Sequence, residues 1–219
     1  MRAVSQHPSL NRFIANKQVF ARNRIIVSLT VLRNAKDKQS KDEALVKMEF
    51  APDATIDEVA LQLDAKVKEA IDADNDNGTA DFAAKLVHLR ILLQGVVWVA
   101  RFLDRYGLLP KFLYDVSPFH CSMFLTNMAS IGMPALYHHL YNFGNTTLFI
   151  AMGKFEKQLV TTREGISTKT VIPLCVTTDE RICGGAEYAE GFACFKHMLT
   201  HPEKLETRPE KVVSELPGK

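Results

Sequence analysis

Cysteine and tryptophan are scarce in this sequence, and the cysteines show no metal-binding spacing. The 219 residues include 4 cysteines and 1 tryptophan, and no two cysteines are separated by only two residues. A CxxC pair would indicate a zinc site or a redox motif, so neither is predicted. The cysteines lie in apolar segments, which is typical of reduced, mostly buried thiols in a cytoplasmic protein; they are Cys121, Cys175, Cys183 and Cys194.

Long hydrophobic runs are absent as well. The most apolar region, 86–109, is interrupted by charged side chains, and its part without charges, 91–100, is too short to cross a bilayer. We therefore predict no transmembrane segment and interpret this region as a buried or interface helix. A helix lying on a membrane surface is the alternative. Residues 1–8 lack the apolar centre of a secretory signal, which also favours a cytoplasmic location.

Blocks of like charge are missing too. The chain has 27 Lys and Arg against 25 Asp and Glu, a net charge of +2, and its basic residues are scattered, so no nucleic-acid partner is predicted. The acidic loop 72–78 resembles a calcium-binding loop, but its glycine stands one place late. Ala83 also occupies the position of the bidentate carboxylate. We interpret this loop as a solvated turn and predict no metal site.

Hydrophobic periodicity predicts one α+β domain over residues 1–202 and a charged, flexible tail over 203–219. The predicted strands are a hairpin over 10–32 with its turn at 15–17, followed by 44–50, 119–128, 146–153 and 169–177. The predicted helices are 55–71, which begins with a Thr55/Glu58 capping box, 79–106 and 186–200. This order favours a mixed sheet with helices packed on one side.

One stretch, Val171–Gly185, reads as an apolar strand, a polar turn over 177–185 and the start of a helix. Its Pro173-Leu174 and Asp179-Glu180-Arg181-Ile182-Cys183-Gly184-Gly185 resemble the end of the catalytic domain of dihydrolipoamide acyltransferases and chloramphenicol acetyltransferase. In that family Asp-His-Arg is followed by two apolar residues and Asp-Gly. Further matches, from Asn11 to about Glu203, include segments 11–14, 117–132 and 145–153.

The resemblance implies a chloramphenicol acetyltransferase-like fold that forms a homotrimer with active sites at the subunit interfaces. It implies coenzyme A or acyl-coenzyme A as a substrate, and no metal. By the resemblance, the family's first strand and the start of its first helix would precede Met1. We therefore expect either that the sequence is a fragment or that a partner chain supplies these elements. We also expect no lipoyl attachment site in this chain and no hinge linker before the domain.

The resemblance also locates the family's catalytic histidine at Glu180 and its supporting aspartate at Gly184. A carboxylate is about two pKa units less basic than an imidazole, although burial can reduce that difference. Glu180 is therefore a candidate base of reduced strength. The alternative for Glu180 is a structural ion pair with Arg181 or another basic residue, and for Gly184 it is backbone freedom before the helix.

Other candidate residues come from the same comparison or from their position. Thr126 and Asn127 match the family's oxyanion-side hydroxyl segment, with hydrogen bonding inside the sheet as the alternative. His138 and His139, with His120, are substitute bases, and structural hydrogen bonding is the alternative for them. Cys183 is a nucleophile by position or a packed thiol. The sequence does not indicate which residues bind coenzyme A.

These patterns predict an acyltransferase-fold protein of the coenzyme A-dependent thioester acyl transfer family. The replacement of the histidine by Glu180 predicts non-standard or weak activity. The alternative is a pseudoenzyme that serves as a catalytically inactive structural or assembly subunit of an acyltransferase oligomer.

Overall fold

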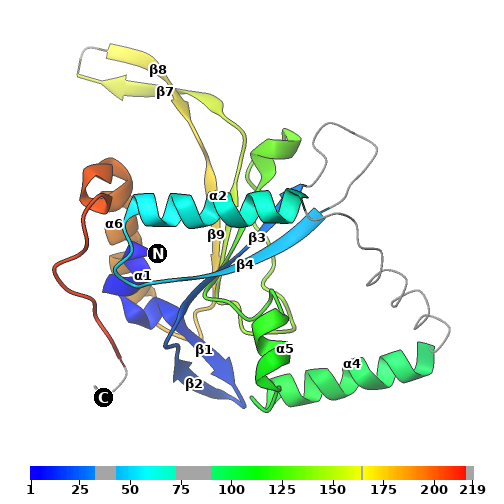
Figure 1. Ribbon diagram of the computed structural model, residues 1–219. Helices are drawn as coiled ribbons and strands as arrows, with labels where there is room; N and C mark the ends of the chain where they lie inside the picture. Colours follow the sequence, from blue (N-terminus) through cyan, green and yellow to red (C-terminus); the bar gives the residue numbers. More distant parts are fainter. Residues whose placement is uncertain (33–42, 73–89, 164, 216–219) are drawn as a thin grey trace.

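A five-stranded mixed sheet forms the centre of the protein. The computed structural model describes residues 1–32, 43–72, 90–163 and 165–215. The sheet has the order β4-β3-β5-β6-β9 (Figure 1). Its strands are β3 (Ile25–Leu32), β4 (Glu43–Phe50), β5 (Met123–Asn127), β6 (Leu148–Met152) and β9 (Leu174–Thr178). β3 is antiparallel to β4 and parallel to β5, β5 is parallel to β6, and β6 is antiparallel to β9.

Helices and two small ribbons surround this sheet. The helices are α1 (Arg2–Gln6), α2 (Ile56–Asp72), α4 (Arg90–Arg105), α5 (Lys111–Val116) and α6 (Gly185–Thr200). The ribbons are the hairpins β1 (Arg12–Ala15) with β2 (Gln18–Ala21), and β7 (Glu156–Thr162) with β8 (Gly165–Val171). Short 3₁₀ turns occupy Pro8–Asn11, Met128–Ile131 and Pro202–Leu205. No helix in the described part of the chain is long and apolar enough to cross a membrane.

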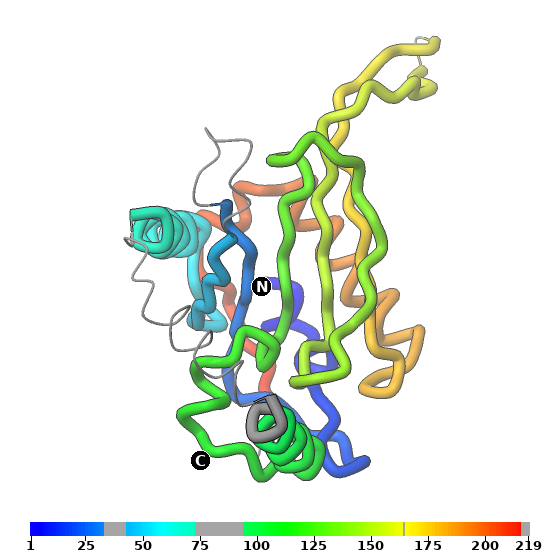
Figure 2. The backbone as a smooth tube through the Cα atoms, turned by 90° about the vertical axis from the view of Figure 1, so that its right-hand side faces the viewer, coloured from blue at the N-terminus to red at the C-terminus, as the bar shows by residue number. Residues whose placement is uncertain are grey.

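Successive side chains along each strand point to opposite faces of the sheet, and the two faces carry different clusters. Val27, Met48 and Met123 belong to the larger core cluster, which also contains Tyr188 of α6 and contacts Val59 of α2. The opposite face carries a smaller cluster that is built on residues of β3, β5 and β6 and covered by Leu140 of the segment after β5. The members of this cluster are Ile26, Cys121, Phe124 and Phe149. Figure 2 shows this segment running beside the sheet on the side away from α2.

Two predicted features are confirmed in local detail. The turn of the first hairpin is one of them: Asn16 and Lys17 both have positive φ, 48° and 60°, as a two-residue hairpin turn requires. The predicted extent of this hairpin, 10–32, is wrong, because β2 ends at Ala21 and 25–32 forms β3 of the main sheet. At the start of α2, the Thr55 N–H donates to Glu58 Oε2 (2.9 Å) and the Glu58 N–H donates to Thr55 Oγ1 (3.4 Å). This is the predicted capping box.

The predicted continuous strand over 169–177 is wrong. β8 ends at Val171 and pairs with β7 in a separate ribbon, whereas β9 begins at Leu174 in the main sheet. Pro173 lies between them, and proline cannot donate a ladder hydrogen bond. Its carbonyl instead accepts from the Gly153 N–H (2.9 Å). β7 was not predicted at all, because its polar, mostly exposed residues lack a buried face.

The predicted helix over 79–106 is described only from Arg90 onward, and the loop 72–78 lies outside the described residues after Asp72. α5 was not predicted, because six residues are too few for a helical period to emerge. The predicted flexible tail from Glu203 stays a prediction. In the structure the Val213 N–H donates to the Ser5 carbonyl (3.1 Å), and Arg12 forms an ion pair with Glu215.

Candidate functional site

The turn after β9 is held rigidly by a buried carboxylate. Asp179 accepts from the Arg181 N–H (3.1 Å) and from Arg181 Nε (2.7 Å) and Nη2 (2.6 Å). Its carbonyl accepts from the Tyr188 hydroxyl of α6 (2.8 Å). Burial acts to raise the pKa of Asp179, but the hydrogen bonds from Arg181 outweigh it and hold that pKa below its ordinary value. The turn is therefore held by the hydrogen bonds between Asp179 and Arg181 and by the bond from Tyr188 of the following helix.

Glu180 stands at the tip of this turn and is exposed. The alternative of an ion pair with Arg181 is not what the structure shows, because Arg181 pairs with Asp179. Within the described residues Glu180 makes no ion pair. Gly184 follows with φ −78°, and a side chain added there would meet no atom within 4 Å. Neither backbone strain nor crowding requires a glycine at this position.

Thr126 and Asn127 lie at the end of β5 that is remote from Glu180. The register places Thr126 opposite Ala151, which is opposite Cys175, whereas Glu180 lies beyond Thr178. Cys175 and Thr178 alone are separated by about 10 Å along a strand. Within one copy of the chain, Glu180 and the two β5 residues therefore lie toward opposite ends of the sheet.

The candidate histidines have three different environments. The ring of His138 stacks on Phe149 at 4.5 Å, its carbonyl accepts from the Thr177 hydroxyl (2.7 Å), and its buried Nε2 lacks a hydrogen-bond partner among the described residues. His139 is exposed. His120 is fully buried.

His120 belongs to a polar cluster that the sequence analysis missed. Its Nε2 lies 2.7 Å from Asp104 Oδ1 and its Nδ1 lies 2.8 Å from Ser117 Oγ. Asp104 Oδ2 accepts from the Gly144 N–H (2.8 Å). Burial acts to raise the pKa of Asp104, but the hydrogen bonds from His120 and Gly144 hold it below its ordinary value. No spacing in the sequence signals this cluster, because its members belong to separate segments.

A groove, which we call the hairpin groove, lies between the β1–β2 hairpin, the C-terminal half of α4 and the loop 141–145. It encloses about 1110 Å³. Its basic lining residues are Lys17, Arg101, Arg105 and Arg181. Aromatic rings line it as well, among them Phe13, Trp98, Phe102, Tyr106, Tyr114 and Tyr141. Asp104 is the one carboxylate in this lining, and Glu180, Thr126, Asn127, His138 and His139 are not part of it.

Two further predicted features concern thiols and metals. Cys183 is buried, and burial raises the pKa of its thiol, which therefore stays protonated at neutral pH. The packed thiol is accordingly the interpretation that fits Cys183. In the described part of the chain no three His, Cys, Asp or Glu side chains gather in a way that would hold a metal ion.

Comparison of the sequence with known proteins finds no matching family model and no matching curated protein. Comparison of the structure does find matches. A probable dihydrolipoamide acetyltransferase from Listeria monocytogenes superposes with a TM-score of 0.57 at 15% identity, over 97% of this chain and 70% of that chain. The chain has the fold of a dihydrolipoamide acyltransferase catalytic domain.

Two more solved structures support this statement. The dihydrolipoamide acetyltransferase of Azotobacter vinelandii gives a TM-score of 0.52 at 13% identity, over 93% of this chain and 66% of that one. The cubic core of a pyruvate dehydrogenase multienzyme complex gives 0.52 at 12% identity, over 93% and 66%. The chain thus spans about two thirds of the length of these proteins. The expected mixed α+β fold is confirmed, and at these identities the likeness concerns the fold alone.

Proposed function

We propose that this chain binds coenzyme A or an acyl-coenzyme A thioester in the hairpin groove and takes part in thioester acyl transfer of non-standard or weak activity. One observation carries the proposal: the groove combines four basic side chains with a wall of aromatic rings. Basic groups suit the phosphates of coenzyme A, and aromatic faces suit its adenine. The fold shared with dihydrolipoamide acetyltransferases favours the same substrate class.

The charge of the groove supports an anionic ligand. Its single lining carboxylate, Asp104, already accepts hydrogen bonds from His120 and the Gly144 N–H. Lys17, at the hairpin turn, and Arg105, near the end of α4, make no ion pair with any described carboxylate. Their positive charges therefore remain available to phosphate groups.

Glu180 is our candidate for the base of the reaction. It would take the proton of an attacking thiol or hydroxyl, whose sulfur or oxygen then attacks the thioester carbonyl. The Thr126 hydroxyl and the Asn127 amide would donate to the oxyanion, and coenzyme A would leave as a thiolate that regains the proton. A free carboxylate is a weaker base than an imidazole, so this transfer is slow. His138 and His139 are the substitutes for Glu180 in the same role.

A complete site of this kind needs two copies of the chain. Glu180 and the pair Thr126 and Asn127 lie toward opposite ends of one sheet, so Glu180 of one copy would meet the β5 residues of the next. This arrangement supports the expected homotrimer with interfacial sites. One of the structurally similar proteins is itself an oligomeric core.

The β7–β8 ribbon gives a second argument for association. It projects from the sheet as an arm (Figure 1) and exposes Leu159 and Ile166 by 74% and 77%. The register places these two side chains on one face of the ribbon. A two-stranded hairpin without further packing is marginally stable in water. We infer that this face packs against another copy.

The alternative function is that of an inactive structural or assembly subunit. It is favoured by the exposed Glu180 and by Gly184, which cannot orient a base. In that case the chain keeps the fold and the association of an acyltransferase and joins a mixed oligomer with an active chain. A cytoplasmic location fits both functions and stays a prediction.

Calorimetric titration with coenzyme A tests the binding step. We expect binding in the wild type, and Lys17→Gln and Arg105→Gln each weaken it by roughly tenfold or more, because each removes a charge-assisted contact. Lys68→Gln, an exposed lysine on α2, is the matched control and leaves the affinity unchanged. Absence of binding to the wild type would remove the proposal.

Acetyl transfer from acetyl-coenzyme A separates the two functions. Glu180→Gln abolishes the weak turnover if Glu180 is the base. Glu180→His combined with Gly184→Asp supplies the side chains that the acyltransferase family has here, and the open space at Gly184 admits the aspartate. We expect this double variant to raise turnover by at least about 10²-fold. Coenzyme A binding without turnover in every variant would establish the assembly subunit instead.

A further inference from the structure

Helices α4 and α5 carry an exposed surface of large apolar side chains, which we call the apolar helix surface. It is represented by Trp98 and Phe102 on α4, Leu108 between the helices, and Phe112 and Val116 on α5. Trp98 and Phe112 are each 67% exposed and Val116 is 79% exposed. Large exposed apolar side chains gathered in this way mark a protein–protein or membrane interaction site. In Figure 1 the two helices lie at the end of the molecule that also holds the β1–β2 hairpin, and α4 extends outward from there.

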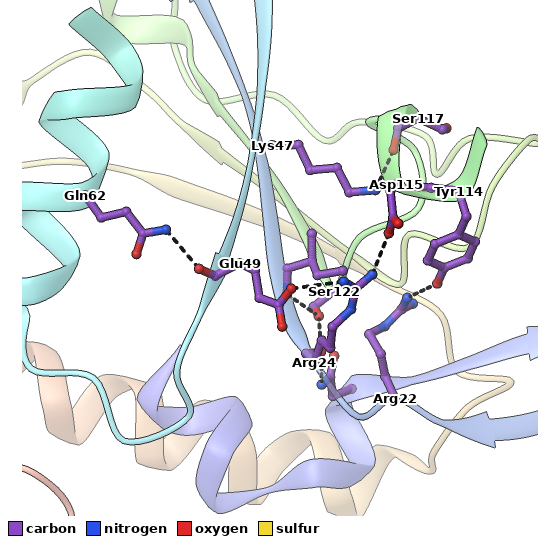
Figure 3. Close-up of polar contacts among 11 residues, drawn as sticks. Arg22, Arg24, Lys47, Glu49, Gln62, Tyr114, Asp115, Ser117 and Ser122 are labelled. Atoms are coloured by element: carbon purple, nitrogen blue, oxygen red, sulfur yellow. Dashed lines mark hydrogen bonds and ion pairs between the residues drawn. The ribbon is translucent and has the colours of Figure 1, made fainter. Parts of the chain in front are cut away.

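Polar contacts join α5 to the rest of the protein. Asp115 accepts from Arg24 at the surface (2.9 Å), and the partly buried Tyr114 hydroxyl accepts from Arg22 (2.9 Å). Lys47 donates to the carbonyls of Tyr114 and Ser117 (Figure 3). These bonds fix the helix with its apolar side turned to solvent.

The C-terminal end of α4 also makes polar contacts with the rest of the protein. Its carboxylate, Asp104, points inward to His120 and to the Gly144 N–H. The Arg105 carbonyl accepts from the Asn16 N–H of the hairpin (2.8 Å). Trp98 and Phe102 stack on each other on the exposed side, with their ring centroids 5.8 Å apart. A helix held at its C-terminal end by polar contacts, with its rings outside, is poorly suited to open water.

Positive charge borders the apolar helix surface. Arg101, Arg105 and Lys111 are exposed, and none of them forms an ion pair with a described carboxylate. Of the two described carboxylates on these helices, Asp104 pairs with the buried His120, and Asp115 pairs with Arg24 at the surface. An apolar surface with aromatic rings and a basic border is the pattern of helices that lie in the headgroup region of an anionic bilayer.

We propose that the apolar helix surface of α4 and α5 docks the protein on the surface of anionic lipid bilayers. A second copy of the chain fits this surface less well, because a two-fold contact of the surface with itself would bring Arg101, Arg105 and Lys111 of both copies together. The docking is peripheral, since no described helix spans a membrane. Trp98 and Phe102 also line the hairpin groove, so the groove opens at the bilayer surface.

The single tryptophan of the chain is a built-in probe of this contact. Trp98 emission is measured with the full chain, without coenzyme A, on vesicles of phosphatidylcholine mixed with phosphatidylglycerol. We expect a shift to shorter wavelength and quenching by brominated lipid. Vesicles of phosphatidylcholine alone give a weaker effect, and high salt reverses the binding to anionic vesicles.

Variants outside the groove locate the contact. Phe112→Ser with Val116→Ser lowers vesicle partition by roughly tenfold or more, because two exposed apolar side chains no longer enter the bilayer. Lys111→Gln lowers it by about fivefold on anionic vesicles only. Leu61→Ser with Leu199→Ser, two exposed leucines on α2 and α6, is the matched control and leaves partition unchanged.

Two results would overturn the proposal. One is the absence of binding to anionic vesicles. The other is a Trp98 shift that depends on protein concentration without vesicles, which would identify a second copy as the partner of this surface. Titration of the same variants with coenzyme A gives unaltered affinity, so failure of membrane docking and failure of the proposed function are read separately.

Discussion

At the scale of single residues, the Asp104–His120 pair joins α4 to the segments that precede β5 and β6. Asp104 belongs to α4, His120 to the loop that enters β5, and Gly144 to the loop that enters β6. Each oxygen of the carboxylate accepts one short hydrogen bond, and the imidazole is fully buried. Loss of the carboxylate charge leaves a buried imidazole and a backbone N–H with weaker acceptors.

Asp104→Asn is therefore expected to destabilise the protein by roughly 1.5–3 kcal/mol at neutral pH, as measured by urea unfolding. The folded pKa of Asp104 lies below the unfolded value of about 3.9, so its stabilising effect is complete above that value and is lost as the pH falls through the folded pKa. The difference between wild type and variant should shrink in that acid range. Asp64→Asn, on the exposed side of α2, is the control with an unchanged midpoint.

Sequence reasoning located the turn of Glu180 but not its surroundings. The motif around Asp179 and Arg181 gave the position, because local residues form the turn. It did not indicate that Glu180 and Thr126 lie toward opposite ends of the sheet, since that depends on β6 and β9 being antiparallel. The Asp104–His120 pair was equally hidden, because it results from tertiary packing of α4.

At the scale of elements, local chemistry was the most predictable. The β1–β2 turn and the start of α2 depend on a few adjacent residues whose preferences agree with the fold. Strand boundaries were less predictable around Pro173, where one apolar run is divided between two sheets. The apolar region 86–109 was interpreted as a buried or interface helix. Its described part exposes Trp98 and Phe102, so a buried helix is wrong, and an interface helix stays a prediction.

The capping box of α2 allows a quantitative prediction. Thr55→Ala removes the hydroxyl that accepts the Glu58 N–H. We expect a loss of about 1 kcal/mol, which corresponds to a decrease in Tm of roughly 2–4 °C for a chain of this size. Thr55→Ser keeps the acceptor and should retain most of the wild-type Tm. An equal Tm for the alanine variant and the wild type would show that α2 is held by packing alone.

At the scale of the whole molecule, substitutions in the β7–β8 ribbon test whether copies of the chain associate through it. Leu159→Asp with Ile166→Asp places two charges on the face of the ribbon that we expect to be covered by another copy. Native mass spectrometry should then show a monomer where the wild type forms an oligomer. Leu61→Asp, equally exposed on α2, is the control that keeps the wild-type mass. A wild-type monomer would contradict the expected trimer.

The general architecture was predictable because its parts are periodic. The order of strands and helices indicated an α+β fold, and the resemblance of 171–185 indicated which one; the structural comparisons confirm both. The two faces of the sheet could be anticipated from the alternation in β3. The hairpin groove could not, because its wall comes from the hairpin, α4 and a loop that are distant in sequence.

The position of β3 between β4 and β5 has a kinetic consequence. On one side it pairs with β4, which follows it closely, but on the other side it pairs with β5. The bond from the Ile26 N–H to Ser122 Oγ joins residues 96 positions apart. A refolding chain must close this long loop before β5, β6 and β9 can be added. Refolding should therefore be slow, on the order of milliseconds to seconds or longer, with the β3–β4 hairpin able to form well before the remaining sheet.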